Sequence, residues 1–138
     1  MKQIEPTASF PVFITEKLQL SKDYFMENFG FNAVFANDWY VHLVTPNGIQ
    51  LGFLMPEHSS QPEFFHQAFN GNGAIFSLEV EDADEAYLTA QARGLNILLP
   101  LKEEEWGQKH FVVKDPSGVK IDVVQSTEPG DEFKENYT

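Results

Sequence analysis

The stretch HFVVKDPSGVKIDVV, residues 110–124, decides the fold prediction. Two apolar runs flank Asp115-Pro116-Ser117-Gly118, whose composition favours a tight turn, so the stretch predicts a β-hairpin. An earlier stretch, residues 39–54, has the same form around Thr45-Pro46-Asn47-Gly48, and Asn-Gly between apolar runs is a strong hairpin signal. The chain therefore carries one pattern twice.

The segments before the two hairpins extend this repeat. A short helix is predicted over Ser21–Phe29, with Gly30 at a position that commonly ends a helix. A second helix is predicted from Asp82, which forms a capping-box-like start with Glu85, to Arg93-Gly94. Further strands are predicted at residues 10–14, 74–80 and 97–101.

These elements predict an α+β chain of two βαβββ modules within a single domain, residues 1–138. Module one spans about 8–55, a Pro-, Ser-, Gln- and Asn-rich linker spans 56–73, module two spans 74–126, and an acidic tail spans 127–138. The tail is expected to fray.

Composition and charge exclude several classes of function. Nine Lys and Arg against 21 Asp and Glu give a net charge of −12, which disfavours nucleic acid and anionic membranes and favours cationic ligands. The absence of cysteine excludes disulfides, thiol nucleophiles and Cys-ligated zinc. The sequence has neither a signal-peptide-like start nor an apolar run of about 18 residues, the length that a membrane helix needs. We therefore expect a soluble cytoplasmic protein. Thirteen phenylalanines are more than a minimal core needs, so some are expected to line a pocket.

Two motifs carry a resemblance to a known family. The motif of module one consists of SKDYF (21–25) and FGF (29–31). The motif of module two consists of WGQKHF (106–111) and DPSG (115–118). The arrangement resembles the vicinal oxygen chelate superfamily, which includes glyoxalase I, extradiol dioxygenases, fosfomycin-resistance enzymes and bleomycin-resistance proteins. The resemblance spans roughly Ser9 to Gln125 and implies curved mixed sheets around a concave cavity, with the helices outside.

The superfamily's enzymes hold a divalent metal with His, Gln or Glu side chains from the first and last strands of each module. The matching positions here are Ser9 or Phe10, Gly52, Ile75 and Asp122. Only Asp122 can ligate, whereas such a site needs three or more protein ligands. We therefore expect no metal and no cofactor at this site. A divalent metal is the alternative.

The remaining features are most similar to the bleomycin-resistance branch, whose members bind ligands without metal. Asp38-Trp39 matches that branch's acidic-aromatic pair, and Trp106 matches a pocket tryptophan. Pro11 matches a proline before which the N-terminal arm crosses to a partner subunit, so the resemblance implies a homodimer. Lys109 replaces the branch's usual arginine.

The predicted ligand-binding residues are the two tryptophans and the polar side chains expected near them: Asp38, Trp39, Gln50, Glu105, Trp106, His110 and Asp122. An aromatic face beside carboxylates suits a flat cation. Asp122, between Ile121 and Val123, is predicted to point away from the face that those two residues bury.

Each candidate has a structural alternative. Large aromatics at strand starts are often core or rim residues, and a strand histidine such as His42 or His110 is more often a satisfied structural residue than a ligand. Glu103–Glu105 is predicted to be a solvated loop, and His58 and His66 in the linker could reach a metal only if the linker folded over the cavity.

The sequence thus predicts metal-free binding and sequestration of a cationic or aromatic, antibiotic-like small molecule rather than catalysis. No catalytic residue is assigned, because no Ser-His-Asp order, P-loop or G-x-G-x-x-G element occurs. One alternative is a divalent-metal-dependent lyase, isomerase or dioxygenase of the superfamily, with His42, His110 or Gln50 as substitute ligands. Another is a dimerisation module whose cavity its own phenylalanines fill.

Overall fold

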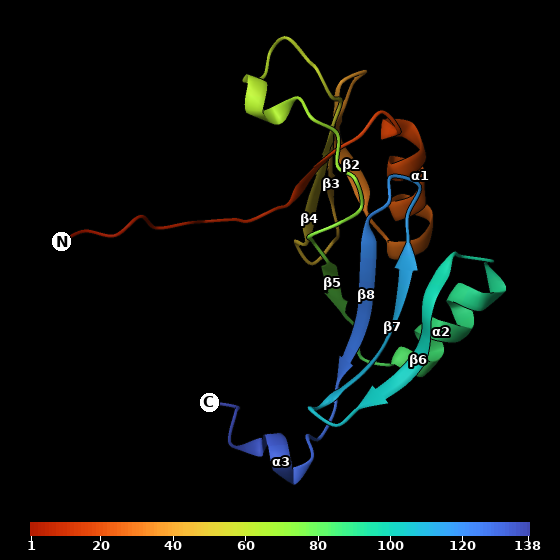
Figure 1. Ribbon diagram of the computed structural model, residues 1–138. Coiled ribbons are helices and arrows are strands. Elements are labelled where there is room, and N and C mark those ends of the chain that lie inside the picture. Colours follow the sequence, from red (N-terminus) through yellow and green to blue (C-terminus); the bar gives the residue numbers. More distant parts are fainter. The chain divides into compact units, whose positions relative to one another are not determined.

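The computed structural model describes residues 1–138, which divide into two compact units, Met1–Asn70 and Gly71–Thr138. Each unit contains a four-stranded mixed sheet with a helix packed against one face (Figure 1). The division falls inside the predicted linker. The predicted α+β fold with two βαβββ modules is confirmed.

The first unit contains, in chain order, β1 (Val12–Ile14), α1 (Leu18–Phe29), β2 (Asn32–Ala36), β3 (Tyr40–Val44), β4 (Gln50–Leu54) and the 3₁₀ helix η1 (Glu63–Phe65). Its sheet has the order β1-β4-β3-β2, with β1 parallel to β4 and the other pairs antiparallel. The N-terminal residues extend away from this sheet (Figure 1), whereas Phe10 and Pro11, directly before β1, contact it.

Alternation along β3 and β4 gives this sheet two different faces. Val41, Leu43, Leu51 and Phe53 are buried on the face that α1 covers, where the ring of Phe25 lies 5.7 Å from that of Phe53. The residues between them in sequence therefore point to the opposite face, which α1 leaves open. That open face holds the side chains described in the next subsection.

The second unit contains β5 (Phe76–Glu79), α2 (Ala83–Ala92), β6 (Ile97–Glu104), β7 (Gln108–Lys114), β8 (Lys120–Ser126) and α3 (Asp131–Lys134). Its sheet has the order β5-β8-β7-β6, with β5 parallel to β8. Phe111, Val113, Ile121 and Val123 are buried on the α2 side, and Asp122 points to the open face as predicted.

Local signals that were identified in the sequence explain where the helices begin and end. The Asp82 side chain accepts a hydrogen bond from the Glu85 backbone N–H at 3.1 Å, which caps α2. Gly30 ends α1 in the left-handed conformation at φ 72°, which glycine adopts without steric cost.

Three predictions about local structure are wrong. No strand was predicted at β2, whose five residues are all exposed and so lack an alternating pattern. β6 continues to Glu104, so Glu103 and Glu104 belong to a strand rather than a solvated loop. The tail, predicted to fray, contains α3 and packs against the turn between β6 and β7. None of the helices has the length and hydropathy of a membrane-spanning helix.

Candidate functional site

A cavity of about 380 Å³ lies on the open face of the first sheet. Val12 and Ile14 of β1 and Leu54 of β4 supply aliphatic surface, and Trp39 and Tyr40 supply aromatic surface. Small-molecule sites typically measure about 300–1,000 Å³ and have mainly apolar walls with a few polar groups. This cavity has the size and lining of such a site.

The linker forms the remaining wall through Gln61 and Phe65. Two backbone hydrogen bonds fix the path of the linker. The Phe69 N–H donates to the Ile14 carbonyl of β1 at 2.8 Å, and the Glu57 N–H donates to the His66 carbonyl at 3.0 Å, which joins two parts of the linker. The linker therefore has a defined path beside the first sheet (Figure 1), and Gln61 and Phe65 on this path line the cavity.

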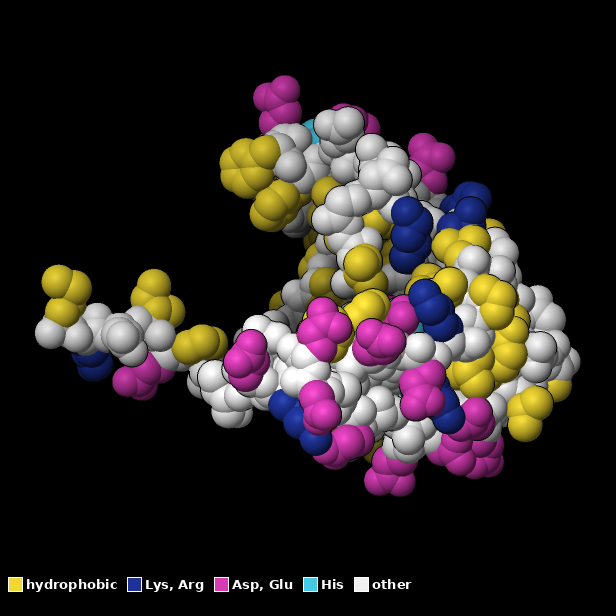
Figure 2. Space-filling model, turned by 60° about the horizontal axis from the view of Figure 1, so that its bottom comes forward, with side chains coloured by type: hydrophobic (Ala, Val, Ile, Leu, Met, Phe, Trp, Pro, Cys, Tyr) yellow, Lys and Arg dark blue, Asp and Glu magenta, His cyan; other side chains and the backbone are white.

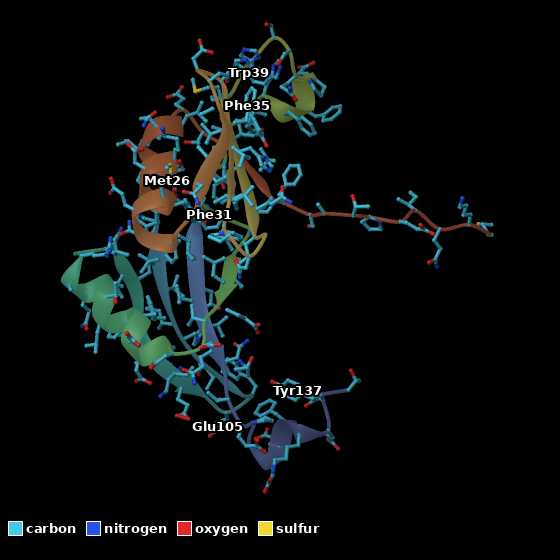
Figure 3. All side chains as sticks on the ribbon, turned by 180° about the vertical axis from the view of Figure 1, so that it is seen from behind. Met26, Phe31, Phe35, Trp39, Glu105 and Tyr137 are labelled. Carbon is cyan, nitrogen blue, oxygen red and sulfur yellow. The ribbon has the colours of Figure 1, made fainter.

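Trp39 is held in place by a linker histidine. The imidazole of His58 stacks on the indole with ring centroids 4.3 Å apart and planes 14° from parallel. Figure 3 shows Trp39 at the end of the first unit where the linker lies. His58, which the sequence offered only as a remote metal ligand, instead supports an aromatic wall of the cavity.

A chain of hydrogen bonds runs from the cavity wall across the open face. Tyr40 Oη lies 2.7 Å from His42 Nδ1, and His42 Nε2 lies 2.7 Å from Gln50 Oε1. The ring of Phe10 meets the His42 ring edge-on, with centroids 4.6 Å apart. His42 is thus a strand histidine whose two ring nitrogens both have partners, in agreement with the structural alternative.

Gly52 lies beneath the hydroxyl of Tyr40. A Cβ atom at this position would lie 2.5 Å from Tyr40 Oη and 3.1 Å from Val12 Cγ2, closer than carbon normally approaches either atom. Only glycine therefore allows Tyr40 to cross the open face at this point.

The second unit has its own polar cluster, in which His110 of β7 lies between two carboxylates. Its Nδ1 lies 2.6 Å from Asp122 Oδ1 and its Nε2 lies 2.9 Å from Glu104 Oε2. Lys102 Nζ lies 3.2 Å from the other oxygen of Glu104. Burial lowers the pKa of His110, but the hydrogen bonds and charges of the two carboxylates outweigh burial and raise the pKa above its ordinary value.

Trp106 lies in the turn between β6 and β7, where the tail packs. The Tyr137 hydroxyl donates to the Trp106 carbonyl, and the ring of Phe133 meets the indole edge-on at 6.3 Å. The Gly130 N–H donates to the Glu105 carbonyl at 2.7 Å. Figure 3 shows Glu105 and Tyr137 close to α3.

Beside this turn is a groove of about 430 Å³ whose walls are almost entirely acidic. Its lining includes Glu103, Glu104 and Glu105 from the turn and Glu128, Asp131 and Glu132 from the tail. Figure 2, which looks toward this end of the second unit, shows more Asp and Glu side chains than Lys or Arg.

The sequence matches the family model described as the glyoxalase/bleomycin resistance protein/dioxygenase superfamily over residues 7–123. The chain belongs to this superfamily. No curated protein matches the sequence.

Solved structures of superfamily members share the fold. A glyoxalase/bleomycin resistance protein/dioxygenase from Nocardioides has a TM-score of 0.75 and 18% identity, covering 94% of this chain and 89% of its own. A superfamily member from Sphaerobacter thermophilus has a TM-score of 0.70 and 25% identity, covering 88% and 98%. A lactoylglutathione lyase from Agrobacterium tumefaciens has a TM-score of 0.72 and 17% identity, covering 89% and 96%.

The side chains at the superfamily's metal-ligand positions do not fit a divalent metal in this member. The Tyr40 hydroxyl covers Gly52, Ile75 is an exposed aliphatic residue, and Asp122 is hydrogen-bonded to His110. No group of three or more His, Asp or Glu side chains in residues 1–138 is arranged to hold a metal ion. A single carboxylate does not provide the donor set such an ion requires.

The structure distributes the predicted site residues of this superfamily member over three places. Trp39 lines the cavity of the first unit. Gln50 is connected to this cavity by the hydrogen bonds that join it to His42 and His42 to Tyr40. His110 and Asp122 meet in the second unit, and Trp106 and Glu105 line a pocket beside the tail that also includes Glu104, the other partner of His110. Asp38 is exposed and does not line the cavity.

Sequence reasoning missed the aliphatic lining of the cavity and four further residues of these sites: Tyr40, Gln61, Phe65 and Glu104. Tyr40 could have been found from the Asn47-Gly48 turn. That turn pairs Val44 with Gln50, so Tyr40, His42 and Gln50 share one face by alternation. Gln61 and Phe65 lie in an irregular linker, whose path no periodic pattern indicates.

Proposed function

We propose that this superfamily member binds a flat aromatic small molecule, cationic rather than anionic, in the cavity of the first unit, without a metal. The observation that carries the proposal is the cavity itself, about 380 Å³ in volume, with Trp39, Tyr40 and Phe65 among mainly apolar walls. Aromatic walls bind flat rings through stacking, and an indole also attracts cations through its π face.

The charge of the chain supports the cationic part of this proposal. A net charge of −12 raises the concentration of cations near the surface and lowers that of anions. No cationic side chain lines the cavity that could pair with an anionic ligand. Binding without chemical conversion is supported by the poor fit of the metal-ligand positions to a divalent metal. The activity that we propose is therefore sequestration of the ligand.

The first test is a binding titration with flat probes of different charge. N-methylacridinium, neutral acridine and anthracene-9-carboxylate are titrated into the protein, and binding is followed by the fluorescence anisotropy of the probe. We expect the cation to bind most tightly. Trp39→Leu should weaken its binding by about 1–2 kcal/mol, five- to thirtyfold, because a stacking and cation–π surface is lost.

Trp106→Leu is the matched control, since it removes the other tryptophan without changing the cavity lining. It should leave the affinity unchanged. Preferential binding of the anionic probe, or of an anionic glutathione conjugate, would contradict the proposal and favour the metal-dependent enzyme alternative.

A further inference from the structure

The hydrogen-bonded chain Tyr40–His42–Gln50, here called the relay, gives the cavity a polar group of defined direction. Tyr40 and His42 are separated by one residue on β3, and Gln50 begins β4 opposite Val44. All three side chains therefore lie on the open face. The two hydrogen bonds of the relay are both 2.7 Å long, and the ring of Phe10 restricts the His42 imidazole from the side.

The direction of the relay follows from the chemistry of Gln50. Its Oε1 is a carbonyl oxygen, which can only accept, so His42 Nε2 must carry the proton of that hydrogen bond. A neutral imidazole has one N–H, and its Nδ1 is then an acceptor. With a neutral His42, the Tyr40 hydroxyl therefore donates its proton to His42 Nδ1.

This direction decides what Tyr40 can offer a ligand. Its only hydroxyl proton is committed to His42, so the oxygen has lone pairs alone for a further partner. That oxygen lies over Gly52 beside Val12, which also lines the cavity. Burial raises the pKa of Tyr40 above 10.0, so the group stays a neutral phenol.

No other side chain of the lining is an acceptor alone, because the single polar group of Trp39 is its indole N–H donor. Gln61 carries both a donor and an acceptor and can pair with either kind of ligand atom. A ligand that places an acceptor against Tyr40 leaves two lone pairs facing each other without a shared proton, which is unfavourable. A ligand that places a donor against Tyr40 forms a hydrogen bond with the hydroxyl oxygen and so extends the relay.

We propose that the relay makes the cavity selective for aromatic amines and other flat aromatic ligands that present an N–H donor to Tyr40. The inference rests on the proposed function and names the ligand class for that same cavity. Tyr40 acts as the contact residue, and His42 and Gln50 act as positioning residues that set its polarity.

The test compares two flat cations that share a ring system. At neutral pH, 9-aminoacridine carries one positive charge and several N–H donors, whereas N-methylacridinium carries the same charge and no donor. We expect wild-type protein to bind 9-aminoacridine about tenfold more tightly, the effect of one hydrogen bond to a charged donor. Tyr40→Phe should reduce this ratio to about one by weakening the aminoacridine alone, with an unchanged circular dichroism spectrum as the folding control.

Gln50→Glu tests the direction of the relay while the Tyr40 ring stays in place. A carboxylate at this position favours the His42 imidazolium, whose Nδ1–H then donates to Tyr40 and turns the hydroxyl proton outward. The preference for 9-aminoacridine should disappear in this variant. A purely structural role for Gln50 would leave the ratio unchanged and so would overturn the relay.

The outcomes separate this inference from the proposed function. If both probes bind wild-type protein equally and Trp39→Leu weakens both, the relay selection is overturned and the proposed function stands. If the tenfold ratio persists in Tyr40→Phe, steric exclusion of the methyl group explains it and the relay is again overturned. If neither probe binds wild-type protein, the proposed function fails and the relay selection fails with it.

Discussion

His110 Nδ1 lies 2.6 Å from Asp122 Oδ1 on the open face of the second sheet, while Nε2 of the same ring lies 2.9 Å from Glu104 Oε2. Both nitrogens can donate only when the imidazole is protonated, so two flanking carboxylates stabilise the imidazolium. The arrangement predicts how the stability of the protein depends on pH.

For His110, the pKa in the folded protein is raised above the ordinary 6.5. Its contribution to stability is therefore complete below pH 6.5 and is lost as the pH rises through the raised value. The hydrogen bond from His110 lowers the pKa of Glu104 below 4.5, so that carboxylate's contribution is complete above pH 4.5 and is lost as the pH falls through the lowered value.

We therefore expect the stability advantage of wild-type protein over His110→Gln to be largest between pH 4.5 and 6.5. Urea denaturation at a series of pH values measures it. An NMR titration that gave His110 a folded-state pKa at or below 6.5 would contradict the prediction.

The second prediction concerns Gly52. Gly52→Ala places a Cβ 2.5 Å from Tyr40 Oη, so the ring must move and the relay must break. We expect a loss of roughly 1–3 kcal/mol in the free energy of unfolding, the usual cost of overpacking. Urea denaturation measures this change.

Combining Gly52→Ala with Tyr40→Phe provides the control, because it removes the hydroxyl that the new methyl group meets. The double variant should be more stable than the sum of the single effects. Strict additivity would mean that the two residues do not contact each other.

The third prediction concerns the packing of the tail on Trp106. Phe133→Ala removes the ring that meets the indole edge-on, and such pairs contribute about 0.5–1.5 kcal/mol beyond their buried area. In a Trp39→Phe background, where Trp106 is the only tryptophan, its fluorescence emission should shift to longer wavelength as the tail loosens.

Lys134→Ala is the matched control on the same short helix. Lys134 pairs with Glu128 at 3.7 Å and Asp131 at 3.1 Å, and all three side chains are exposed. Exposed ion pairs contribute little to stability, so the Trp106 emission should not change. Equal shifts in both variants would show that the aromatic contact does not hold the tail.

The repeated fold could be predicted because its signals are local. The Asn47-Gly48 and Ser117-Gly118 turns and the Asp82 cap each act within a few residues, and the structure has a hairpin or a helix start at each. β2 lacked such a signal, because each of its residues is exposed.

The site was less predictable, because its contacts join distant parts of the chain. Trp39 was identified as a candidate, but the linker wall depends on backbone hydrogen bonds such as that between Phe69 and Ile14, which no composition indicates. The His110–Asp122 contact follows from the register of β7 and β8, whereas Glu104 joins it only because β6 is longer than its apolar run suggested.

The linker wall of the cavity has a consequence for rates. Residues 58–65 form hydrogen bonds only within the linker and contact Trp39 through the stacked ring of His58, whereas the opposite wall belongs to β1 and β4. The weaker wall opens first in local fluctuations. We therefore expect the residence time of a bound molecule to depend on how often this segment moves away from the cavity, and a ligand that contacts Phe65 to slow that motion.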